Sequence, residues 1–130
     1  MNLITPLYAS ILALLCIALS VRTLNLRRRF GVAIGPGDEP LLARAVRAHG
    51  NFTEYVPLSL LLLLLLDLES NRDVLLHSLG LMLVVGRTLH AYGVSQVRED
   101  FRFRVAGMAL TFTMMASCAL ILLTRYLSFA

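Results

Sequence analysis

Apolar residues along the chain gather into four long runs, separated by shorter polar segments. The runs cover residues 3–21, 40–68, 74–93 and 105–127. Because a helix needs about 20 mostly apolar residues to cross the hydrocarbon core of a bilayer, each run is long enough for one transmembrane span. The pattern therefore predicts an all-α integral membrane protein, a four-helix bundle in which residues 1–130 form a single membrane domain.

The first two runs carry further detail. The first has no positive charge ahead of its apolar part, and its arginines follow it, so we interpret it as a retained span and not a signal peptide. The second is polar in its first half and nearly all leucine over residues 58–66. As a helix it would be about 40 Å long, against a hydrocarbon core of about 30 Å. We expect its polar half to stand at the membrane surface or to face protein.

The composition excludes several other classes of protein. Of the 130 residues, 58% are hydrophobic and 15% are charged, whereas soluble domains have about 45–50% and about 25%. A soluble enzyme would lack the polar surface to cover its core, and disorder requires low hydrophobicity. Cys16 and Cys118 lie inside apolar runs, and no cluster has metal-ligand spacing. We therefore expect neither a disulfide framework nor a metal site.

The basic residues indicate how the chain sits in the membrane. The net charge is +4, and every basic residue is an arginine. The first and third connections hold most of the arginines, whereas the second, residues 67–73, is mostly acidic. By the positive-inside rule, the first and third connections should be cytoplasmic and both termini should lie outside. Topology accounts for this basic excess, so it predicts no nucleic-acid partner.

Polar side chains also lie inside two of the runs. Helical spacing places four of them on one stripe of the second run: Arg47, Asn51, Glu54 and Tyr55. The third run adds Arg87 and His90, one turn apart, on a face shared with Leu83 and Val94. Both stripes lie toward the cytoplasmic ends of their helices, so they can converge at one depth. They could fix helix packing through internal charge pairs and hydrogen bonds, or they could form a ligand site.

As a ligand site, this set of side chains suits a small zwitterionic anion. Glutathione is such a ligand, because it has two carboxylates, one ammonium group and a thiol. Arginines would bind the carboxylates, and Glu54 would accept hydrogen bonds from the ammonium group. A neighbouring arginine would favour the thiolate form of the thiol. The apolar helix faces would hold a lipophilic electrophile beside it.

Two stretches of the chain resemble a known family. Residues 47–57, RAHGNFTEYVP, closely resemble the R-x-x-x-N-x-x-E-Y-x-P signature of the MAPEG family, the membrane-associated proteins in eicosanoid and glutathione metabolism. Residues 86–93, GRTLHAYG, are similar to the helix-three pattern of its small bacterial members. The resemblance implies a homotrimer in a bacterial inner membrane. It also implies glutathione between helices one and two of one subunit and helices three and four of its neighbour.

The resemblance further implies roles for single residues. Those expected to contact glutathione are Arg27, Arg47, Asn51, Glu54, Tyr55, Arg87 and His90, the last two from the adjacent subunit. The family arginine that stabilises the thiolate lies near the start of helix four, where Arg102 and Arg104 are both candidates. The choice between these two candidate catalytic residues stays open. Many eukaryotic members have a tyrosine one turn after the His90 position, where this chain has Val94.

Three functions are compatible with these predictions. The first is a glutathione-dependent transferase or peroxidase that acts on lipophilic electrophiles or lipid hydroperoxides. The second is a membrane protein that binds glutathione or a lipid headgroup without turnover. The third, a transporter or channel subunit, is disfavoured because the second half of run two is purely apolar, and a pore needs polar groups across its whole depth.

Overall fold

The computed structural model describes residues 3–69, 73–98 and 100–129. Over these ranges the chain forms four α-helices: α1 (Thr5–Phe30), α2 (Pro40–Glu69), α3 (Asp73–Ser95) and α4 (Phe101–Phe129). All four are long and apolar enough to cross a membrane. The predicted all-α fold with four span-length helices is confirmed.

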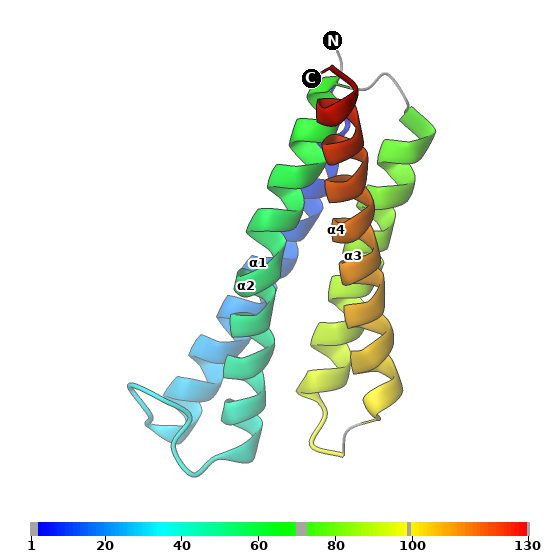
Figure 1. Ribbon diagram of the computed structural model, residues 1–130. Coiled ribbons are helices and arrows are strands. Elements are labelled where there is room, and N and C mark those ends of the chain that lie inside the picture. Colours follow the sequence, from blue (N-terminus) through cyan, green and yellow to red (C-terminus); the bar gives the residue numbers. More distant parts are fainter. Residues whose placement is uncertain (1–2, 70–72, 99, 130) are drawn as a thin grey trace.

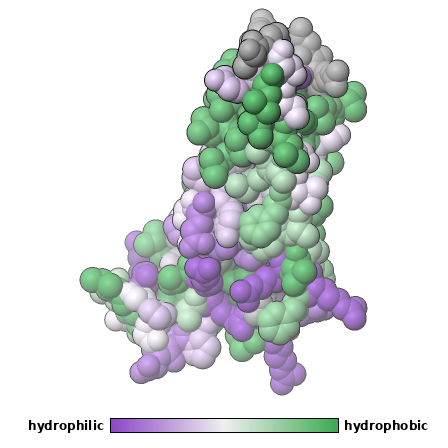
Figure 2. Space-filling model, in the orientation of Figure 1, coloured by the Kyte–Doolittle hydropathy of each residue, from purple (hydrophilic) through white to green (hydrophobic). Residues whose placement is uncertain are grey.

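The helices run up and down, so the connections alternate between two ends of the molecule (Figure 1). One end, here called the loop end, carries the connections α1–α2 and α3–α4. The other, here called the terminal end, carries the start of α1 and the end of α4. Polar residues gather toward the loop end, while most of the surface above it is apolar (Figure 2). The first and third connections therefore share one side, as the charge pattern predicts.

Two helices extend well beyond the apolar runs. Helix α1 continues past residue 21 to Phe30, where Gly31 ends it in a left-handed conformation with φ of 67°. Its last turn contains Arg27, Arg28 and Arg29, whose positive charges favour a helix C-terminus. Helix α4 begins at Phe101, because the Asp100 carboxylate accepts a hydrogen bond from an amide of the first turn. Hydropathy marks the apolar part of a helix, whereas capping groups decide where the helix ends.

Glycines allow α3 and α4 to approach closely. A Cβ atom placed on Gly107 would lie 2.5 Å from the carbonyl oxygen of Gly86 and 2.6 Å from the backbone nitrogen of His90. A Cβ on Gly93 would lie 2.9 Å from the backbone nitrogen of Arg104. Backbone contact of this kind is typical of helix pairs in membranes, where small residues form the interface. It makes α3 and α4 one closely packed half of the bundle.

The two halves of the molecule, α1–α2 and α3–α4, are joined at the terminal end. The hydroxyl of Tyr8 lies 3.0 Å from both Nδ1 and the carbonyl oxygen of His77, and its ring packs on Gly80. Within the α1–α2 half, the buried Asp67 carboxylate of α2 accepts hydrogen bonds from the backbone N–H groups of Ile4 and Thr5, at 2.8 and 2.7 Å. From this end the halves diverge toward the loop end (Figure 1).

Candidate functional site

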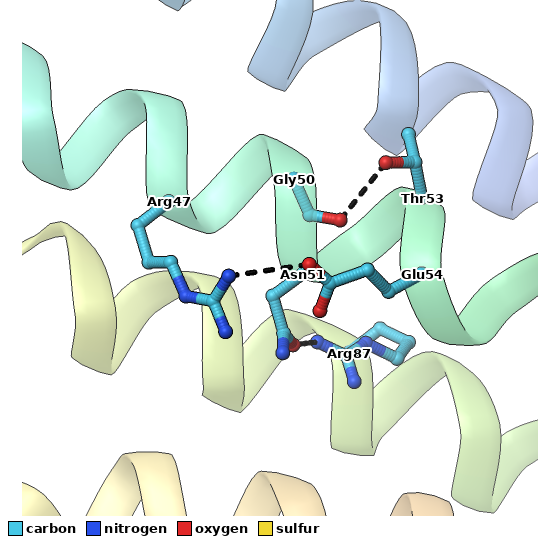
Figure 3. A network of polar contacts seen from close by, with 6 residues as sticks. All are labelled: Arg47, Gly50, Asn51, Thr53, Glu54 and Arg87. Atoms are coloured by element: carbon cyan, nitrogen blue, oxygen red, sulfur yellow. Dashed lines mark hydrogen bonds and ion pairs between the residues drawn. The ribbon is translucent and has the colours of Figure 1, made fainter. Parts of the chain in front are cut away.

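The polar stripe of α2 lies near the loop end and faces α3. Figure 3 shows side chains from these two helices gathered around Asn51. On α2, Arg47 Nη1 lies 3.2 Å from Glu54 Oε1, and the two side chains are 60% and 49% exposed. An exposed ion pair of this kind contributes only about 0–1 kcal/mol. Both charged groups are therefore accessible, and a ligand can separate them at little cost.

Arg87 is completely buried beneath this pair. Its Nη2 donates a 2.6 Å hydrogen bond to Asn51 Oδ1, and its guanidinium lies 5.7 Å from the ring centre of Tyr55. Its Nε has no hydrogen-bond partner. Among the described residues, no carboxylate forms an ion pair with it. A buried charge is costly unless it is paired, and here a neutral amide is the main polar partner.

The rest of the α3 stripe lies against α4. His90 is buried, and its Nδ1 is 3.3 Å from the backbone oxygen of Arg104. Leu83 and Val94 are buried with it and with Arg87, so the face predicted for these four residues is confirmed. On the α2 side, Tyr55 packs edge-on against Phe112 of α4. The structure thus brings together every predicted polar residue of the two stripes, within one chain.

Of the three other predicted site arginines, Arg104 adjoins this cluster through its backbone contact with His90, and among the described residues no hydrogen bond joins Arg27 or Arg102 to it. Arg27 donates to carbonyl oxygens of the loop that follows α1, at 2.8 Å to Gly35 and 3.4 Å to Ala33. Arg102 and Arg104 are exposed in the first turn of α4. In one chain, Arg27 therefore holds a loop, while Arg102 and Arg104 lie on the exposed surface at the start of α4.

Within one chain, Arg87 contacts Asn51 and has no exposed surface. The contact with glutathione from an adjacent subunit that the resemblance implies stays a prediction. A ligand on this face would touch Arg47 and Glu54 directly. Arg87 would act on it through its positive charge and through Asn51.

Sequence reasoning missed two further arginines near the site. Arg22 of α1 donates from Nη1 to Ser95 Oγ and from Nη2 to the Ser95 carbonyl oxygen. Arg44 of α2 donates to the carbonyl oxygen of Val94 at 3.3 Å. We call Arg22 and Arg44 the arginine clamp. The sequence gives one weak signal for it, because the last turn of α3 has no basic residue of its own.

Comparisons with known proteins agree with the geometry. The model of the MAPEG family matches residues 5–124. The chain is also 35% identical over 121 residues to the inner membrane protein YecN of Escherichia coli strain K12, covering 93% of this chain and 87% of that protein. The YecN protein of E. coli O6:H1 strain CFT073 matches to the same extent. The chain, with its signature residues gathered at one site, therefore belongs to the MAPEG family.

Proposed function

We propose that this protein is a glutathione-dependent transferase or peroxidase of the inner membrane that acts on lipophilic electrophiles. Its glutathione site would be the exposed Arg47–Glu54 pair above the buried Arg87. The observation that carries the proposal is Arg87, a fully buried cation whose main polar partner is the neutral Asn51. Such a site attracts an anion, and the MAPEG family is associated with glutathione.

The charges of the site complement those of glutathione. Arg47 and Arg87 with Glu54 give a net charge of about +1, and two carboxylates with one ammonium group give a net charge of about −1. Arg47 would bind a carboxylate, and Glu54 would accept hydrogen bonds from the ammonium group. The buried Arg87 would add an attraction that water screens little. On binding, Arg47 and Glu54 would give up their exposed ion pair, and each would form a contact with glutathione instead.

Reaction would require a cation close to the thiol. When bound, glutathione supplies a nucleophilic and reducing thiolate. Arg102 and Arg104 are exposed at the start of α4, so either can reach outward to stabilise that thiolate, and we place the site at the interface of a homotrimer. The apolar helix faces would hold the lipophilic substrate beside it, which adds the advantage of proximity.

Glutathione titration of the purified protein tests the proposal. The ultraviolet difference absorbance of the thiolate should rise with glutathione, and conjugation to a chromogenic aryl halide should follow. Arg47→Ala and Glu54→Gln should each weaken both signals by at least about tenfold, the effect of losing one charge-assisted hydrogen bond. Arg125→Ala is the matched control, because it breaks a comparable pair with Glu69 at the terminal end.

Each outcome of this titration separates two functions. Binding without a thiolate signal or turnover would replace the enzyme with a binding protein. No binding at millimolar glutathione would refute both. Chemical crosslinking in detergent should stop at a trimer, and a dimer or tetramer would remove the support for an interface site.

A further inference from the structure

The arginine clamp joins the two halves of the bundle at the end of α3. Toward the loop end, α1–α2 and α3–α4 diverge (Figure 1). Arg22 and Arg44 bridge the two halves at the last two residues of α3. Arg22 bonds to Ser95, and Arg44 bonds to Val94. The contacts join residues up to 73 positions apart in the sequence. The long arginine side chains thus connect both helices of one half to the end of the other.

The acceptors of the clamp are groups that a helix leaves unsatisfied. The last four carbonyl groups of an α-helix have no intrahelical donor, and the C-terminus carries a partial negative charge. In α3 these carbonyls include those of Val94 and Ser95. Arginines from α1 and α2 supply both the missing donors and the positive charge. An arginine suits this place better than a lysine, because its planar group can bond Oγ and the carbonyl of Ser95 together.

The clamped turn lies close to the buried arginine of the site. Val94 and Ser95 follow Arg87 by seven and eight residues, which is about 10–12 Å along a helix. Because a helix is stiff over two turns, fixing its C-terminus also fixes where Arg87 meets α2. The Asn51–Arg87 bond, at 2.6 Å, leaves little tolerance for a shift of α3.

We propose that Arg22 and Arg44 are positioning residues that hold the C-terminus of α3 against α1 and α2, and thereby keep Arg87 bonded to Asn51. The proposal concerns the protein itself and does not depend on which ligand the site binds. It predicts that loosening the clamp loosens α3 from its C-terminus back to Arg87, while the terminal end of the bundle stays intact.

Hydrogen–deuterium exchange on the full-length protein in nanodiscs tests this. In Arg22→Ala, amides of residues 87–95 should exchange about tenfold faster, the effect expected for losing hydrogen bonds from a charged donor. Arg44→Ala should act in the same direction, and the double variant should exceed either. Ser95→Ala removes one acceptor and should give a smaller increase. Arg98→Ala removes an exposed charge from the same end and should change nothing in α3.

Two further variants separate positioning from general destabilisation. Arg22→Lys keeps a cationic donor and should restore part of the protection. Asn51→Asp gives Arg87 a carboxylate, so it should restore protection around residue 87 in the Arg44→Ala background. Unchanged exchange of residues 87–95 in the double variant, or equal acceleration in peptides around Asp67, would overturn the proposal. If the double variant fails to fold, the exchange of residues 87–95 in Ser95→Ala and Arg22→Lys tests the proposal instead. Unchanged exchange in both would overturn it.

Discussion

Replacing Asn51 by leucine tests how the buried Arg87 is held. Leucine has the same branching as asparagine but a larger volume, so the change removes the 2.6 Å hydrogen bond while keeping the shape of the side chain. A hydrogen bond to a charged group contributes about 1.5–3 kcal/mol, and removing one partner of a buried pair costs about 3–5 kcal/mol. Because Asn51 is neutral and Tyr55 retains its cation–π contact, we expect a loss near the overlap of these ranges, about 3 kcal/mol.

A double-mutant cycle isolates the interaction energy between Asn51 and Arg87. Reversible unfolding in mixed micelles should show a large loss for Asn51→Leu and about 1–3 kcal/mol for Arg87→Met, which strands a neutral amide. The double variant Asn51→Leu/Arg87→Met should be close to the wild type or more stable, because no buried polar group remains unpaired. Two losses that simply add within about 0.5 kcal/mol would refute the reasoning, since contacting residues should be coupled.

Four other substitutions have clear expected results in unfolding or proteolysis assays. Gly107→Ala should destabilise the protein by about 1–3 kcal/mol or more through overpacking, because its Cβ would strike backbone atoms of α3. Gly50→Ala, which meets nothing within 4 Å, should instead stabilise by about 0.5–1 kcal/mol; equal effects of the two would contradict the close α3–α4 packing. Asp67→Ala should cost about 0.5–2 kcal/mol, as for the loss of a helix cap, and protease should then cleave faster near Ile4. Arg27→Ala should speed proteolysis within residues 31–39 without changing the unfolding midpoint, and a lowered midpoint would show that this loop supports the core.

The pattern along the sequence predicts the helices and their buried faces because both depend on local periodicity. Leucine-rich runs of span length leave few alternatives to four helices. The steps of three and four between Leu83, Arg87, His90 and Val94 place them on one side of α3 regardless of what packs there, and all four are buried. The ends of the helices depend on single capping groups such as Asp100, so hydropathy places them less well.

Contacts between helices could not be predicted, because periodicity does not fix how one helix is rotated and shifted against another. Arg22 has the same local signature whether it marks the membrane surface or bonds to Ser95, 73 residues away. Asp67 reads as part of a polar connection, yet it lies in α2 and caps α1. Arg27 matches a family position by sequence, while its donors in one chain go to the following loop.

The choice of hydrogen-bond acceptors at the loop end bears on function as well as on stability. Arg22 and Arg87 bond to hydroxyl, carbonyl and amide oxygens, and among the described residues neither forms an ion pair with a carboxylate. These neutral acceptors give neither guanidinium a bonded negative charge, and Nε of Arg87 has no hydrogen-bond partner. An apolar pair at 51 and 87 would hold α2 against α3 at no such cost. Packing alone therefore does not account for the buried cation of Arg87. An anion bound at Arg47 would supply the negative charge that Arg87 lacks.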